Sequence, residues 1–259
     1  MVHASKLIGS VQHALDILNL FNQEAEELGT TEIARKLNMH KSTVASLVYT
    51  LEANGYLTQN MKTRKYRLGF MLAERVSVML NHLQVRQVAY PFLQELHQEF
   101  NETINLGGLD GASVVDIERM QSTRPLGRRS EIGIRTMAHS TALGKAMLAC
   151  LSPTELTAFI SLHGLPALTE HTITDPHCLL KDLEKTRQLG YAEDNEENEI
   201  GGRCTAGPIF DQTGRVVAAV SISLPTERLP LTDFPLYGNH IRETARAISS
   251  SLGYQYRSF

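Results

Sequence analysis

Residues 30–68 restrict the fold of this 259-residue chain more than any other part of the sequence. Apolar residues recur there at helical spacing in two stretches, one starting after the predicted N-cap Thr31 and the other running over residues 41–54. A turn of only three residues joins them, so the helices must pack closely, and Ala34 supplies a small side chain opposite Val44. The other inward-facing residues are Ile33, Leu37, Met39, Leu47, Val48 and Leu51. The pattern predicts a helix-turn-helix.

A short β-hairpin is expected directly after these two helices. Gly55 is a suitable residue just beyond the end of the second one. Residues 56–59 and 65–68 then have strand-like composition and flank a polar tip at residues 60–64. A hairpin in this place makes the unit a winged helix-turn-helix.

The helical segments on either side of this unit are also visible as apolar periodicity. A first helix is predicted over residues 9–22, with Ser10 as its N-cap. Its apolar residues at helical spacing are Val11, Ala14, Leu15, Leu18 and Phe21. Helical periodicity also covers residues 70–100 almost throughout, with Pro91 near the start of a second piece. We expect residues 70–83 to pair with a second copy of the chain, since Leu72, Val76, Met79 and Leu80 need cover.

The charge of residues 30–68 favours DNA as their partner. They hold seven Lys and Arg residues against two acidic ones, a local charge of +5, although the whole chain has a net charge of −3. Local charge decides whether a surface attracts phosphates. The N-terminus of the second helix can reach base edges, and the wing can lie on the backbone or in the minor groove. The predicted DNA-binding residues are Thr31, His40, Lys41, Ser42, Thr43, Ser46, Tyr49, Lys62, Arg64 and Arg67. The alternative is a small helical domain for protein contacts.

Length and composition predict a second, different domain. Hydrophobic residues make up 42% of the chain and charged residues 20%, which is ordinary for a globular protein. We expect a DNA-binding domain at residues 1–69, a linker and dimerisation helix at 70–84 and a further domain at 85–259. Residues 81–259 hold 16 basic and 21 acidic residues, so charge is segregated between the domains.

Several classes of protein are disfavoured by what the sequence contains. Its apolar runs are shorter than the roughly 20 residues of a membrane helix, and its start does not resemble a signal peptide, so we expect a cytoplasmic protein without membrane contact. The three cysteines have no metal-type spacing, and His163, His171 and His177 are scattered. We therefore expect no metal, no cofactor and no disulfide framework.

The second domain is predicted to be α+β, with a sheet covered by helices. The candidate strands are residues 103–108, 113–120, 132–138, 191–193, 203–210 and 216–224. The candidate helices are residues 141–151, 153–161, 175–189 and 233–252. Asp110-Gly111 and Gln212-Thr213-Gly214 are hairpin turns by composition.

One strand of this sheet carries two hydroxyl groups on a single face. Along residues 216–223 the side chains alternate, so Ser221 and Ser223 lie in line with Val217 and Ala219. Hydroxyls among small residues indicate either a cavity with polar walls or a strand end that meets solvent.

Three separated strings resemble the IclR family of bacterial transcriptional regulators. They are KSTVASLVYTLEANGYL followed by KYRLG, then HSTALGKAML, then GYAEDNEENEIGGRCTAGPIFDQTGRVVAAVSISLP. The resemblance covers essentially the whole chain. It implies a winged helix-turn-helix, a linker helix used in dimerisation and a GAF-like α/β effector domain. Within the family, DNEE and RC resemble the sugar-acid regulators of the ketodeoxygluconate type.

The resemblance also implies where an effector binds. The matching positions that line a site for small oxoacid-type ligands are Asp194, Cys204, Ser221 and Ser223, with the backbone amides of Ala142 and Leu143 at a helix start. A helix N-terminus with free N–H groups is a natural cradle for a carboxylate. For Glu197 we expect a loop-shaping role, such as an ion pair with Arg203.

The recognition helix departs from the family at two positions. Many members carry a basic residue, usually Arg, where this chain has Ser46, and an aromatic or polar residue at Ala45. The operator sequence therefore does not carry over.

The leading hypothesis is a one-component repressor, without enzymatic activity, that binds a small carboxylate, oxoacid or sugar acid. As a dimer or tetramer it would match a pseudo-palindromic operator in double-stranded DNA. The alternatives are a regulator responding to an aromatic acid, or one acting through protein contacts. A further alternative is an enzyme with Cys204 as nucleophile and His139 as base, which requires the two to lie within hydrogen-bond reach.

Overall fold

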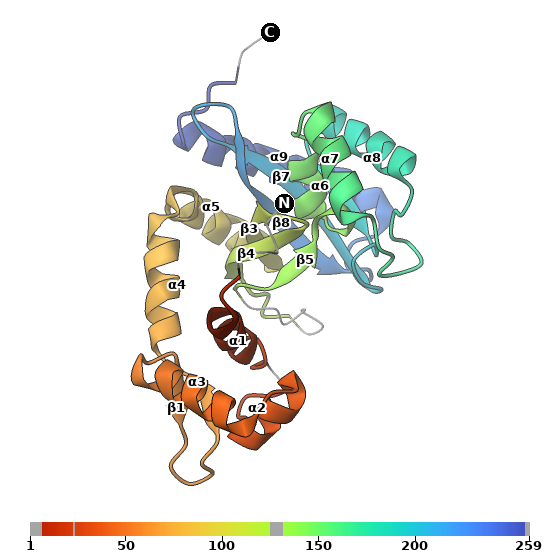
Figure 1. Cartoon of the computed structure of the whole chain (residues 1–259). Helices are drawn as coiled ribbons and strands as arrows, with labels where there is room; N and C mark the ends of the chain where they lie inside the picture. The colour runs from red at the N-terminus through yellow and green to blue at the C-terminus, as the bar shows by residue number, and fades with distance from the viewer. Residues whose placement is uncertain (1–6, 23, 125–131, 257–259) are drawn as a thin grey trace. The chain divides into compact units, whose positions relative to one another are not determined.

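The computed structural model describes residues 7–22, 24–124 and 132–256, which form two compact units, Met1–His82 and Leu83–Phe259. The first contains α1 (Gly9–Leu18), α2 (Thr30–Leu37), α3 (Lys41–Ala53), the hairpin strands β1 (Leu57–Gln59) and β2 (Tyr66–Leu68), and α4 (Met71–His82) (Figure 1). In the described part of the chain, no helix is long and apolar enough to cross a membrane.

The predicted helix-turn-helix and wing are confirmed. Ala34 and Val44 both lie in the small core that α1, α2 and α3 share. The turn works because Asn38 adopts the left-handed conformation that ends α2, with φ of 52°. β1 and β2 pair in antiparallel register from Leu57↔Leu68 to Gln59↔Tyr66, so the hairpin follows α3 directly.

Two predicted N-caps are wrong, and so is part of the predicted apolar face of the first helix. Extended Ile8 precedes α1, so Ser10 lies inside its first turn. α2 begins after Gly29, whose N–H donates to Oε2 of Glu32 at 2.7 Å, and Thr31 is therefore already helical. The α1 helix ends at Leu18 rather than at residue 22 and buries Ile17 completely, because the core lies on that side. Val11 and Leu15 are exposed.

The second unit is one antiparallel sheet with helices on both faces. Its strands are β3 (Thr103–Asp110), β4 (Ser113–Met120), β5 (Arg135–Met137), β6 (Ala192–Asn195), β7 (Gly202–Phe210) and β8 (Val216–Pro225). Their order is β5-β4-β3-β8-β7-β6. Its helices are α5 (Gln84–Phe100), α6 (Ala142–Leu148), α7 (Pro153–His163), α8 (Pro176–Leu189) and α9 (Phe234–Ser251).

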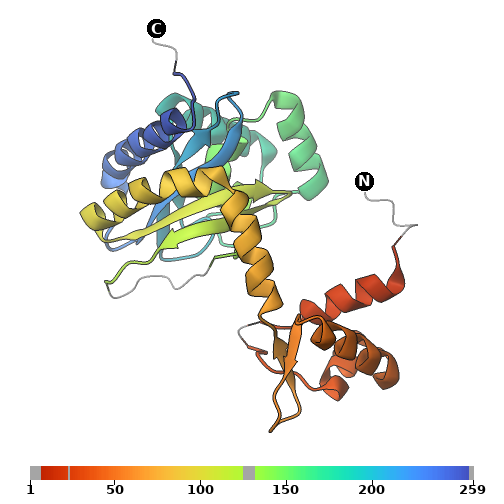
Figure 2. The ribbon, with the colours of Figure 1, turned by 90° about the vertical axis from the view of Figure 1, so that its left-hand side faces the viewer.

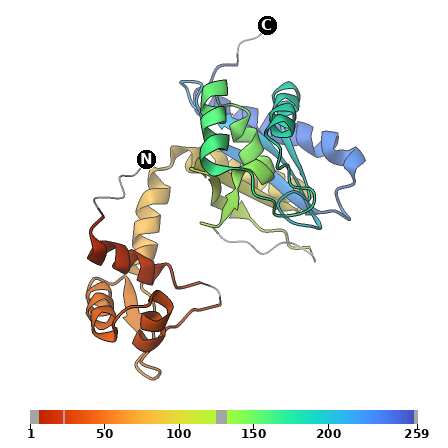
Figure 3. The same ribbon diagram turned by 45° about the vertical axis from the view of Figure 1, so that its right-hand side comes forward.

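The glycines of the central strands show which helices cover which face. A Cβ on Gly207 would meet Ala245 of α9, whereas a Cβ on Gly107 would meet Leu143 of α6. Helices α5 and α9 lie side by side on one face (Figure 2), and α6, α7 and α8 form the layer on the other (Figure 3). The predicted α+β fold of the second domain is confirmed.

The predicted elements of this unit are all present, with changes at their ends. The strand expected at residues 132–138 shortens to β5, because Ala138–Ser140 form a 3-10 turn before α6. The two predicted hairpin turns are confirmed: Gly111 and Gly214 have φ of 60° and 81° between paired strands. Pro91 lies inside α5, seven residues after its first residue, rather than near its start.

Candidate functional site

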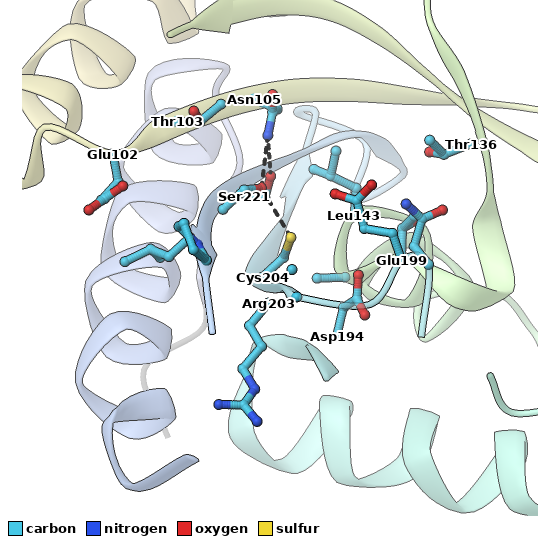
Figure 4. A pocket seen from close by; sticks show the side chains of 18 of the residues that line it. Glu102, Thr103, Asn105, Thr136, Leu143, Asp194, Glu199, Arg203, Cys204 and Ser221 are labelled. Carbon is cyan, nitrogen blue, oxygen red and sulfur yellow. Dashed lines mark hydrogen bonds between the residues drawn. The ribbon is translucent and has the colours of Figure 1, made fainter. Parts of the chain in front are cut away.

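A cavity of about 320 Å³ opens at the end of the sheet where β6, β7, β8 and β3 meet the start of α6 (Figure 4). Its wall contains all six residues predicted for effector binding: Ala142, Leu143, Asp194, Cys204, Ser221 and Ser223. Asn105, Arg119 and Arg203 also line it. Most of the polar side chains in the wall therefore come from the sheet, and Ala142 and Leu143 come from the helix.

Strand register explains why residues so far apart in the sequence meet here. Asp194 on β6 lies opposite Cys204 on β7, Cys204 lies opposite Ser223 on β8, and Ser223 lies opposite Thr103 on β3. Side chains in one such row project from the same face of a sheet. Ser221 is two residues along β8 and so faces the same way, as the alternation in the sequence predicted.

The first two residues of α6, Ala142 and Leu143, line the cavity. Thr141 is the N-cap, and its Oγ1 accepts the N–H of Gly144 at 3.2 Å. The first amide with an intrahelical acceptor is that of Lys145, which donates to the Thr141 carbonyl. The N–H groups of Ala142 and Leu143 come before it and have no acceptor within the helix.

Asp194 is a buried carboxyl held by the turn that follows β6. Its Oδ1 accepts the backbone N–H of Glu197 at 2.9 Å. Burial, reinforced by the nearby carboxylate of Glu197, raises the pKa of Asp194 to about 7, against the opposing effects of Lys145 and the backbone N–H groups. Near neutral pH this group can therefore act as a hydrogen-bond donor as well as an acceptor.

The ion pair expected between Glu197 and Arg203 is not formed. Glu197 Oε1 instead lies 2.5 Å from Nζ of Lys145, and Arg203 pairs with Glu196 at 3.4 Å. The cause is local geometry. Arg203 lies opposite Asn195 across the β6–β7 ladder and donates to its Oδ1 at 2.7 Å, while Glu196 turns the chain with φ of 63° and directs Glu197 toward α6.

Lys145 is a deeply buried charge close to the site. Its side chain is 1% exposed and contacts Asp182 of α8 at 2.9 Å as well as Glu197. Burial opposes its charge, but the two carboxylates outweigh burial and hold the pKa of Lys145 above its usual value. Sequence reasoning missed this residue, although a single lysine within the apolar run of residues 142–149 is a signal that it needs a buried partner.

Asn105 and Arg119 were also missed. The pattern of β3 contains the clue, since Thr103 and Asn105 alternate with the buried apolar residues Ile104 and Leu106. Two polar residues on one face of a central strand indicate a polar cavity there, just as the two serines do on β8.

The geometry does not support a cysteine enzyme. Nε2 of His139 lies 3.0 Å from the carbonyl oxygen of Pro166, and His139 is not among the residues that line the cavity. Burial lowers the pKa of the His139 imidazole, and this effect is larger than the opposing effect of the hydrogen bond to Pro166. Cys204 Sγ lies 3.1 Å from Ser223 Oγ instead. Among the described residues there is also no group of His, Cys, Asp and Glu that could hold a metal ion.

The predicted DNA-binding residues are all exposed in the first unit, on α2, at the start of α3, along its polar face and on the wing. Ser46 Oγ donates to the carbonyl of Ser42 at 3.2 Å, so it is turned along the helix. Glu27 was missed: it accepts Asn60 Nδ2 at 2.9 Å and Thr63 Oγ1 at 3.1 Å, and so fixes the base of the wing tip.

Comparisons with known proteins cover both units. Residues 10–60 match the family model described as "IclR helix-turn-helix domain", and residues 77–250 match "Bacterial transcriptional regulator IclR C-terminal". The Escherichia coli regulator XynR is 38% identical over 96% of this chain and 98% of its own length. The regulator KdgR of the same organism is 37% identical over 95% of this chain and 94% of its own. The crystal structure of the Thermotoga maritima IclR matches 95% of this chain and 99% of that one, with a TM-score of 0.80 and 34% identity.

Proposed function

This chain belongs to the IclR family of bacterial transcriptional regulators, and we propose that it is a repressor whose second unit binds a small carboxylate, oxoacid or sugar acid. It is a DNA-binding regulator with a ligand-binding C-terminal domain, as its similarity to family regulators over both units shows, and its relatives are not enzymes. The strings DNEE and RC, which resemble those of sugar-acid regulators, are in keeping with a sugar-acid ligand.

The observation that carries the proposal is the composition of the cavity wall. Ala142 and Leu143, at the start of α6, line a volume that Ser221 and Ser223 border from the sheet, and their N–H groups have no acceptor within the helix. Helix N-termini favour anions through their free N–H groups and the helix dipole. A volume of about 320 Å³ lies at the lower end of the range for small-molecule sites, roughly 300–1,000 Å³. A small organic acid fits the hydrogen-bond donors of this wall and the size of the cavity.

Asp194 adds a requirement for a polar group on the ligand. It lies in the same row of side chains as Cys204 and Ser223. An ionised Asp194 repels a carboxylate, so it would face a hydroxyl or oxo group elsewhere on the ligand, or donate a proton to it when neutral. A hydroxy or oxo acid satisfies this arrangement better than a plain fatty acid.

The first unit would act as one of two symmetric DNA-reading heads in the cytoplasm. The exposed apolar residues Val76 and Met79 of α4 offer a surface for pairing with a second copy. A dimer or tetramer would match a pseudo-palindrome with half-sites about 34 Å apart or a multiple of that distance. Ligand binding would change operator affinity by favouring one arrangement of the two heads over another.

The test is operator binding with and without candidate acids, in three proteins. The double variant Ser221→Ala with Ser223→Ala should bind operator like the wild type and ignore the acid. Lys41→Ala should bind the acid and lose operator affinity. If both variants lose operator binding equally, the division into two functions is wrong. If no small oxoacid or sugar acid binds the wild type while an aromatic acid or a protein does, those alternatives replace the proposal.

A further inference from the structure

We propose that Asn105 and Arg119 set the hydrogen-bond polarity of the cavity, so that Ser221 and Ser223 present donors to the ligand and favour a carboxylate over its primary amide. This inference rests on the proposed function for the existence of an acidic ligand. It assigns to two residues outside the predicted site the role of orienting the hydroxyl groups within it.

The orientation begins at Arg119, which is 8% exposed and lines the cavity. A guanidinium group only donates hydrogen bonds. Its NH1 lies 2.8 Å from Oδ1 of Asn105, opposite it in the β3–β4 ladder. The amide of Asn105 must therefore turn its oxygen toward Arg119, because the reverse orientation would oppose two donors.

The other end of the Asn105 amide is then a donor for both serines. Nδ2 lies 3.1 Å from Ser223 Oγ and 3.3 Å from Ser221 Oγ (Figure 4). An amide nitrogen carries two hydrogens, so the two hydroxyl groups use both of them. The Asn105 side chain thus has its oxygen and both its hydrogens engaged, which fixes it between Arg119 and β8.

The serine hydroxyls keep one proton each for another partner. Each accepts from Asn105, and Ser223 also accepts from Cys204 Sγ at 3.1 Å. Across the described parts of the chain, neither hydroxyl donates to a protein group. Both lie on the wall of the cavity, so their protons are available to a molecule inside it.

A wall of donors discriminates between two ligands of the same shape. A carboxylate accepts at both oxygens, and hydrogen bonds to a charged acceptor are the stronger kind. The matching primary amide has a donor, its NH₂ group, in place of one carboxylate oxygen. That group would face other donors of the wall, and a buried donor without an acceptor costs affinity. We expect the wild type to prefer the carboxylate by at least about ten-fold.

A neutron structure of the ligand-free protein tests the polarity without knowledge of the ligand. The proposal predicts Asn105 with its ND₂ group toward β8 and the deuterons of Ser221 and Ser223 directed into the cavity. Deuterons on either serine that point to Asn105 would overturn it. If no acid binds the wild type in solution, the proposed function fails, while this result still decides the polarity.

A thermodynamic cycle in the full-length chain tests the consequence for binding. Pyruvate and D-gluconate, each with its primary amide, serve as probes in calorimetric titrations. Asn105→Asp keeps the shape and the contact with Arg119 but offers only acceptors, so the serine hydroxyls must turn to it. Ser223→Ala should then weaken carboxylate binding by about ten-fold in the Asn105 background and hardly at all in the Asn105→Asp background.

The cycle separates the effect of the serine hydroxyl orientation on binding from the effect of the negative charge that Asn105→Asp introduces. Simple repulsion of the anion would leave the effect of Ser223→Ala equal in both backgrounds, and that result would overturn the proposal. Thr205→Val is the matched control, because it removes a buried hydroxyl from β7 that lies outside the cavity wall. It should change neither the affinity nor the preference for carboxylate. If Asn105→Asp does not fold, the neutron structure of the wild type remains decisive.

Discussion

Replacing Lys145 by Met should destabilise the second unit far more than replacing Lys185 by Met. Both lysines lie 2.5 Å from a glutamate, Lys145 from Glu197 and Lys185 from Glu193. They differ in environment, because the Lys145 side chain is 1% exposed and that of Lys185 is 55% exposed. The comparison therefore holds residue type and distance constant and varies burial.

The expected magnitudes follow from that difference in burial. Removing one partner of a buried pair leaves an uncompensated charge and costs about 3–5 kcal/mol. Here two carboxylates lose their cation, since Asp182 also lies 2.9 Å from Lys145. An exposed pair is worth about 0–1 kcal/mol. Urea unfolding of the full chain, followed by circular dichroism, measures both losses in the free energy of unfolding.

Two further measurements identify the unpaired charge as the cause. Adding Glu197→Gln to Lys145→Met should recover part of the lost stability, because a neutral amide replaces a buried anion. The loss should also shrink between pH 7 and pH 4.5, because burial raises the pKa of Glu197 and its protonation removes the charge. Equal losses for the two lysine variants, at all pH values, would refute the reasoning.

Four further predictions concern single positions. Burial raises the pKa of Asp194 to about 7, so its contribution to stability should fall as pH rises from about 4 to about 7. In the Asp194→Asn variant, the urea concentration at the midpoint of unfolding should therefore depend less on pH over that range. Thr205→Val should raise the free energy of unfolding by about 1 kcal/mol, since the Thr205 hydroxyl is buried and lacks a partner among the described residues; a loss of stability would contradict this. Gly144→Ala should lower the melting temperature and cost about 1–3 kcal/mol or more, because a Cβ there would overlap the backbone of Ala138; an unchanged melting temperature would count against the tight approach of α6. Arg67→Ala should reduce the slope of log affinity for operator against log salt concentration by about 1 in anisotropy titrations, and an unchanged slope would remove Arg67 from the phosphate contacts.

Local patterns were sufficient to predict most of the secondary structure. Turn chemistry is local, so Gly111 and Gly214 marked two hairpins correctly. The small residue Ala34 opposite Val44 identified a close helix contact, and the core confirms it. Errors arose where several neighbouring residues could each cap the same helix. Ser10 and Thr31 are good N-caps by composition, but Ile8 and Gly29 hold the capping positions.

Long-range pairing explains what the sequence did not reveal about the site. Lys145 and Glu197 are 52 residues apart, and only the path of the turn after β6 brings them together. Asn105 meets the serines of β8 across a separation of 116 and 118 residues. Such contacts depend on strand order and register, which the spacing of apolar residues along a single helix or strand does not reveal.

The most direct test of the central account is the reciprocity between ligand and operator. Operator affinity is measured with and without a bound acid, and acid affinity is measured for free and operator-bound protein. Linkage requires the two ratios to be equal. We predict equal ratios well away from one for the wild type and ratios of one for the Ser221→Ala, Ser223→Ala double variant. An acid that binds the cavity and leaves both ratios at one in the wild type would contradict the account.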